Sequence, residues 1–277
     1  MSAVSLQPKA GAFRSTRRSP VTLARVVRSE WTKLWSLRST RWSLLAGFVA
    51  MAGLGPLIAA ITMANWNHLS TSDRLTFNAI DRSLGGFNLA QLAIGVLGVM
   101  VISGEYSTGQ IRSSLMAVPR RLPVLWAKLL VFASVAFGLM LIASLISFFA
   151  SQSIFTEHHV NVSLGQAPAL RTLLGVVLYM TVTGVMCTAL GTILRSTAGA
   201  ISTYVGLLFV LPGIVAILPS SVGNAINAYL PSSAGRTLAQ AMPDAHTLSP
   251  WGGFALYCGY TVVLVAVAAY LLVRRDA

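Results

Sequence analysis

Long apolar runs separated by short polar segments dominate the chain, and six of the runs reach or approach the length of a membrane span. An α-helix rises 1.5 Å per residue, so about 20 apolar residues cross a hydrocarbon core of roughly 30 Å. The runs are too continuously apolar for the alternating strands of an outer-membrane barrel. The pattern predicts an all-α membrane protein. The predicted spans are about 43–64, 86–103, 129–154, 173–194, 200–218 and 251–273.

Composition supports the membrane class. Of the 277 residues, 55% are hydrophobic and only 10% are charged, whereas a soluble domain needs far more polar surface to cover its core. Both cysteines fall inside apolar runs, which suggests packing residues and no disulfide framework. We expect two parts: a cytoplasmic tail with an interfacial helix over 1–42, and a six-span transmembrane domain over 43–277.

The basic residues are distributed unequally between the two sides of these spans. The chain has 20 Lys and Arg against 7 Asp and Glu. Sixteen of the basic residues fall on the side of the two termini, and the other four are Arg74, Arg82, Arg171 and Arg236. Cytoplasmic loops carry the excess of Lys and Arg, so both termini are predicted to be cytoplasmic. The basic excess is therefore a topology signal and argues against a nucleic-acid partner. The Arg-, Ala- and Gly-rich composition is typical of a GC-rich bacterium, which indicates a multi-pass protein of the bacterial inner membrane.

No Asp, Glu, Lys, Arg or His lies within the six predicted spans. Proton-coupled carriers place ionisable groups near the middle of the membrane, so proton-driven transport is disfavoured. The sequence also lacks the H-E-x-x-H, G-x-S-x-G and phosphate-loop motifs, and it predicts no catalytic, metal or cofactor site. The strongest metal candidate, Glu157-His158-His159, is a polar loop segment of the kind that is usually solvated. If the protein moves a solute uphill, the energy comes from another polypeptide.

An amphipathic segment precedes the first span. Read as a helix, residues 21–39 carry a polar stripe of Arg25, Arg28, Ser29, Thr32, Lys33 and Ser36, with Leu23, Val27, Trp31, Leu34 and Trp35 opposite. A basic amphipathic helix with tryptophans lies in the membrane interface. One interpretation is a membrane-surface anchor alone. Glu30 fits that interpretation poorly, because a carboxylate at the apolar edge needs a partner.

The loop between the second and third spans is the other candidate. Gly109 and Pro119 delimit a short helix, on which Ile111, Leu115 and Met116 share one face beside Arg112. A helix held parallel to the membrane in this way is suited to docking a soluble partner. The alternative is an ordinary positive-inside loop, which explains Arg120 and Arg121 but leaves Glu105 unexplained.

These two segments resemble those of ATP-binding-cassette (ABC) transporter permeases of the type-2 exporter kind. Glu30-Trp31-Thr32-Lys33-Leu34 followed by Arg38 is similar to that family's N-terminal interfacial helix. The series Glu105, Gly109, Arg112, Leu115, Pro119, Arg120 and Lys128 is similar to the pattern of its first cytoplasmic loop, although Thr108 here precedes the glycine. The resemblance implies two paired permease subunits, each contacting a separately encoded ATPase that binds the ATP. The contact residues that it implies are Glu30, Lys33, Arg38, Glu105, Gly109, Arg112, Leu115, Pro119, Arg120 and Arg121.

The functional hypothesis is a permease subunit without an ATPase site of its own, exporting a lipophilic or amphiphilic compound. A self-sufficient carrier or channel and a membrane assembly or anchoring protein are the alternatives. Small residues at Thr181, Gly184, Thr188 and Gly191 form a stripe that favours close helix contact. The sequence leaves open whether that stripe faces another span, a second subunit or the transport path.

Overall fold

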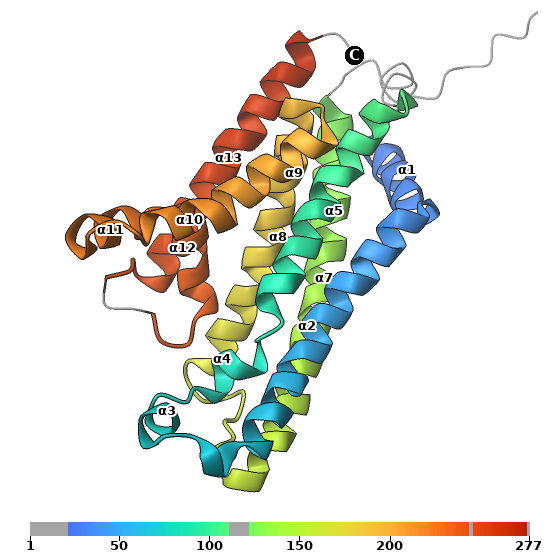
Figure 1. Cartoon of the computed structure of the whole chain (residues 1–277). Helices are drawn as coiled ribbons and strands as arrows, with labels where there is room; N and C mark the ends of the chain where they lie inside the picture. The colour runs from blue at the N-terminus through green and yellow to red at the C-terminus, as the bar shows by residue number, and fades with distance from the viewer. Residues whose placement is uncertain (1–21, 111–121, 244–245, 276–277) are drawn as a thin grey trace, which may run out of the picture.

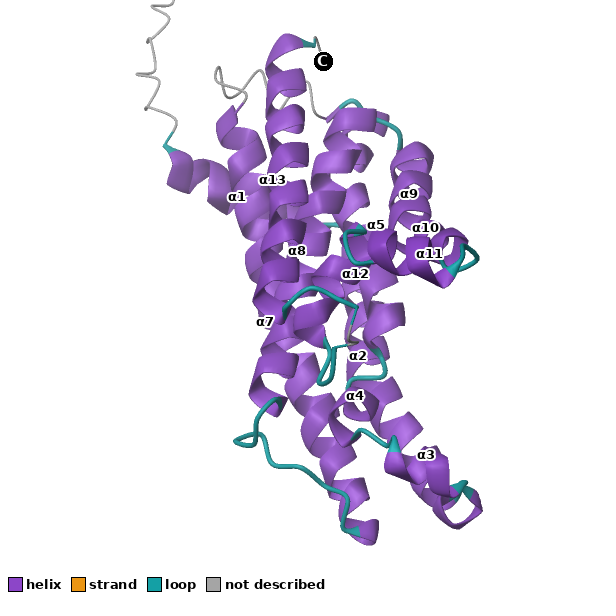
Figure 2. Ribbon diagram, turned by 90° about the vertical axis from the view of Figure 1, so that its left-hand side faces the viewer, coloured by secondary structure: helices purple, strands orange, loops and turns teal. Residues whose placement is uncertain are grey.

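The computed structural model describes residues 22–110, 122–243 and 246–275. Within these ranges the chain forms a bundle of helices and no strands (Figure 2). Six helical segments of the described part are long and apolar enough to cross a membrane, which confirms the predicted all-α class. They are α2 (Arg38–Ala64), α5 (Phe87–Ser107), α7 (Leu122–Phe155), α8 (Ala169–Leu194), the segment made by α9 (Thr197–Val205), η3 (Gly206–Val210) and α10 (Leu211–Val215), and α13 (Pro250–Arg274).

Two of these helices extend beyond the apolar runs that predict them. Helix α5 continues past the expected end at residue 103 as far as Ser107, and α7 begins at Leu122 rather than at 129. Glu105 and Lys128 therefore lie inside transmembrane helices and are buried, whereas the sequence placed both in a loop. Hydropathy ends a span at the first charge, but a helix continues where that charge has a partner.

Short helices follow α2 and α7 at the end of the bundle opposite the start of α2. These are η1 (Trp66–His68), α3 (Thr71–Leu75), α4 (Ala79–Ser83) and η2 (Thr156–His158). Side chains at the helix starts satisfy the first free N–H groups: Ser70 accepts from Asp73, and Asn78 accepts from Ile80 and Asp81. The turns therefore follow from local sequence.

The connection between the fifth segment and α13 contains α11 (Ser220–Asn227), α12 (Pro231–Arg236) and η4 (Thr237–Ala239). The structure packs α12 and η4 against α8 and α13 (Figure 1). Glycines permit this approach, because a Cβ at Gly175 would overlap the Leu238 carbonyl and one at Gly235 would overlap the Tyr179 ring.

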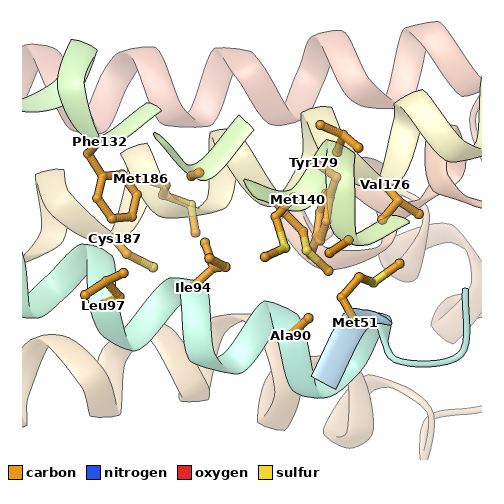
Figure 3. Close-up of a cluster of buried hydrophobic side chains, with 14 of the residues drawn as sticks. Met51, Ala90, Ile94, Leu97, Phe132, Met140, Val176, Tyr179, Met186 and Cys187 are labelled. Carbon is orange, nitrogen blue, oxygen red and sulfur yellow. The ribbon is translucent and has the colours of Figure 1, made fainter. Parts of the chain in front are cut away.

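The core lies between α5, α7 and α8, where apolar and sulfur-containing side chains interdigitate (Figure 3). Helix α8 is central, with 72% of its most apolar stretch buried. Its small-residue stripe faces the neighbouring helices of the same chain: a Cβ at Gly184 would overlap Phe132, and one at Gly191 would contact Ile102 at 2.7 Å. The question that the sequence left open is thus decided in favour of packing within the subunit.

The two ends of the described chain lie at one end of the bundle. Figure 1 shows α1 (Leu23–Ser36) and the last turn of α13 together there. Arg275 donates to the carbonyl of Ile193 at the end of α8 over 3.2 Å. That this end faces the cytoplasm remains a prediction from the charge distribution.

Candidate functional site

Helix α1 lies against the ends of α5 and α7. Leu37 adopts an extended conformation and separates α1 from α2. Three residues one turn apart, Val26, Glu30 and Leu34, form the buried stripe of α1. Val26 packs in a cluster with Val124 and Ala127 of α7.

This orientation corrects one detail of the sequence interpretation. Trp31 and Trp35 were grouped with Leu34 on a single apolar side. The structure divides that side, because Leu34 faces the bundle while Trp31 and Trp35 are 47% and 42% exposed. The buried face of α1 therefore includes Glu30, whereas its tryptophans are exposed.

Glu30 contacts Lys128, the residue at the centre of the site. The Lys128 ammonium, 3% exposed, donates to Glu30 Oε2 over 2.6 Å and to Glu105 Oε1 over 2.9 Å. It also donates to the Val101 carbonyl over 3.3 Å. One buried cation from α7 thereby joins a carboxylate of α1 to a carboxylate of α5.

Lys33 closes the arrangement on the more exposed side. Its ammonium lies 2.7 Å from Glu30 Oε1 and 3.3 Å from Glu105 Oε1. Two carboxylates and two ammonium groups thus alternate around a closed circuit, which we call the charged ring (Glu30, Lys33, Glu105 and Lys128). The formal charge of the ring is zero, which is the condition under which burial of four ionised groups is tolerated.

The pKa values of the α1 members reflect this arrangement. Burial acts to raise the pKa of Glu30, but the charges and hydrogen bonds of Lys128 and Lys33 outweigh it, so the pKa lies below the usual value. Burial acts in the opposite sense on Lys33, and its two carboxylate partners raise the pKa above the usual value. Both residues are held in their charged forms.

A small cavity lies beside the ring, bordered by Leu34, Leu37, Thr40 and Val101 as well as by the ring residues. Its volume of about 20 Å³ is enough for one water molecule. Oε2 of Glu105 is buried and has no hydrogen-bond partner among the described residues. An unsatisfied buried oxygen of this kind costs about 1–3 kcal/mol.

The remaining predicted contact residues fall into two groups. Arg38 begins α2 and is exposed, outside the charged ring. Gly109 follows Thr108, the residue that caps the end of α5, and has a φ of 70°, a conformation that favours glycine. Arg112, Leu115, Pro119, Arg120 and Arg121 lie outside the described residues, so their predicted role stays a prediction.

Sequence reasoning included Lys128 in the family pattern but gave it no partner. A signal was present in the sequence, because Glu30 and Glu105 both needed a cation and Lys128 begins an apolar run. No group of three or more His, Cys, Asp or Glu residues suited to a metal ion occurs in the described part of the chain. The charged ring connects three helices, α1, α5 and α7, through ionic contacts.

A family model described as ABC-2 family transporter protein matches residues 38–277. The chain belongs to this family. As an ABC-2 permease it is a multi-pass membrane transport subunit, and the ATPase activity lies in a separate nucleotide-binding subunit. The match includes Glu105 and Lys128 but begins after α1. A search of curated proteins finds no match.

Proposed function

We propose that this permease receives the ATP-driven movement of its partner ATPase through α1 and the loop after α5, and passes it to the bundle through the charged ring. The single observation that carries the proposal is that Lys128 contacts both Glu30 and Glu105 while almost fully buried. The predicted contacts of the loop residues with the ATPase belong to the same proposal.

The ring favours movement of α1 as one unit with α5 and α7. If α1 moved alone, Glu30 would leave Lys128 with one carboxylate fewer, and separating a buried pair costs about 3–5 kcal/mol. The extended residue Leu37 provides a joint between α1 and α2. A push on α1 is therefore transmitted to the ends of α5 and α7. The resulting movement is a rocking of α2 and α5, the first two spans, against α8 and the α9–η3–α10 segment, the fourth and fifth spans.

The proposed cargo is a lipophilic or amphiphilic compound carried outward. Lys128 and Glu105 lie near one end of the bundle, and Arg171, in the first turn of α8, lies near the other. Between these two levels the six spanning segments carry no charged side chain. Such a bundle suits an apolar portion better than an ion or a sugar. The proposed assembly comprises two permease subunits, identical or different, in a bacterial inner membrane, with both termini in the cytoplasm. It needs no cofactor beyond the ATP held by the partner.

The test uses the permease expressed with its cognate ATPase and reconstituted in liposomes. Lys128→Met breaks the ring, and Arg41→Gln is the matched control, because Arg41 is an exposed basic residue on the same end of the bundle. We expect Lys128→Met to abolish most permease-dependent stimulation of ATP hydrolysis and Arg41→Gln to retain it. Circular dichroism and elution volume establish that both variants are folded.

Unchanged stimulation in a folded Lys128→Met variant would refute the coupling role of the ring. The rival hypotheses have their own outcomes. Concentration of a solute by the permease alone in liposomes would favour a self-sufficient carrier. Absence of any complex with the ATPase in mild detergent would favour an assembly or anchoring role.

A further inference from the structure

Another charged residue packs against the bundle, far from the ring. Arg236 ends α12, which packs against α8 and α13. The Arg236 guanidinium lies over the Phe87 ring, 5.2 Å from its centroid, at the start of α5. The sequence counted Arg236 as an ordinary loop cation, so its position follows from the folding back of α12.

Neighbouring polar groups orient this guanidinium without neutralising it. Its Nη2 donates to Asn88 Oδ1 and, over 3.2 Å, to Gln91 Oε1. Gln91 is itself fixed, because it is fully buried and its amide donates to the Tyr179 hydroxyl over 3.0 Å. Both acceptors are uncharged amides, so the positive charge stays uncompensated by them.

One donor of the guanidinium lacks an acceptor. Its Nε is buried and has no hydrogen-bond partner within the described ranges of the chain. A buried donor without an acceptor costs about 1–3 kcal/mol, and such a group in a folded protein calls for an explanation. An anionic oxygen is the acceptor that satisfies both the Nε–H and the positive charge.

A cavity of about 300 Å³ adjoins Arg236. One part of its wall is polar and the other is apolar, with Leu84, Phe87, Val176 and Met242. A bare phosphate would leave most of this space empty. The mixed wall fits an anionic head group attached to a short apolar portion.

One carboxylate also borders the cavity, and it is already engaged. Asp81 Oδ1 accepts the backbone N–H of Ala241 over 3.0 Å, and Arg171 is near enough to interact with its charge. Arg171 also donates to the carbonyls of Gln240 and Ala241. Two arginines against one aspartate leave a net positive charge around the cavity.

We propose that this cavity binds the anionic head group, phosphate or carboxylate, of an amphiphile, with Arg236 as the binding residue and the apolar wall holding the first carbons. The site needs neither the ATPase nor the charged ring. Its failure and the failure of the coupling proposal are therefore separate results.

The experiment is a ³¹P NMR titration of the purified full chain in dodecyl maltoside, with butyl phosphate, inorganic phosphate and, as a neutral competitor, butyl glucoside. We expect butyl phosphate to bind about 4-fold more tightly than inorganic phosphate for each methylene group that the wall buries. Butyl glucoside should fail to displace it. Arg236→Gln should weaken binding about 10-fold or more, and Arg236→Lys should retain part of the affinity.

Two further variants guard against loss of fold as the cause. Asn88→Asp keeps the shape but places a carboxylate against Arg236, so it should also weaken binding about 10-fold. Arg74→Gln is the matched control. Arg74 donates to the Trp66 carbonyl and lies over the Trp66 ring, outside the cavity, so this variant should bind butyl phosphate as the parent does. Wild-type affinity in Arg236→Gln with a lowered melting temperature would mean that Arg236 only fastens α12 to α5. Equal affinity for the two phosphates, or an equal loss in Arg74→Gln, would also overturn the proposal.

Discussion

Removal of the Lys128 ammonium is the perturbation whose consequences the structure determines most closely. In Lys128→Met the stem of the side chain keeps its volume, but Glu30 and Glu105 remain buried with only the partly exposed Lys33 between them. Two ion pairs of 2.6 and 2.9 Å are lost at once. Breaking a buried pair from one side costs about 3–5 kcal/mol, because the remaining charge stays desolvated.

The partner substitution separates this effect from loss of packing. Glu30→Gln removes one negative charge and leaves Lys128 paired with Glu105, so it should cost about 1–3 kcal/mol. In the double variant the charge balance of the ring is restored. We therefore expect the double variant to be more stable than the sum of the single losses predicts, by about 1–3 kcal/mol.

The assay is unfolding by added SDS in mixed micelles, followed by circular dichroism, for the parent, the two single variants and the double variant. Hydrogen exchange over α1 provides a local readout, and exchange there should rise in Lys128→Met. A cost below about 1 kcal/mol for Lys128→Met, or strictly additive losses in the double variant, would refute the reasoning that the ring is a coupled ionic unit. Arg41→Gln should change stability by no more than about 0.5 kcal/mol.

Three other predictions concern pH and packing. The folded pKa of Glu30 lies below its ordinary value of 4.5 and that of Lys33 above 10.5. The stability that these two charges contribute should thus be complete between about pH 5 and 10. It should fall on acidification through the lowered Glu30 pKa and on alkalinisation through the raised Lys33 pKa. In a profile of melting temperature against pH, Glu30→Gln should reduce the loss of stability on the acid side. Gly98→Ala should destabilise the bundle by about 1–3 kcal/mol in SDS unfolding, because the new Cβ would lie 2.5 Å from the Gly184 carbonyl oxygen. In the control, Gly138→Ala, the new Cβ would meet nothing within 4 Å, so the change should be neutral or slightly stabilising. Equal effects of the two substitutions would contradict the packing argument. Tyr204→Phe removes a buried hydrogen bond of 2.8 Å to the Gln91 carbonyl and should cost about 1 kcal/mol, and no loss would mean that this bond is unimportant.

The sequence by itself determined the class of the protein and the approximate position of every span, because hydrocarbon admits only long apolar helices and six such runs are present. It also indicated that Glu30 needed a partner. It did not identify Lys128 as that partner, since the two residues are 98 positions apart and hydropathy treats any lysine as the end of a span.

Only the tertiary structure decided where charges are tolerated inside the bundle. Lys128 and Glu105 lie within helices because α1 brings the matching charges to them. Arg236 enters the bundle because Gly175 and Gly235 let α12 and η4 approach. The free energy of burying a charge depends on its partners in space, and local sequence carries no record of partners supplied by distant segments.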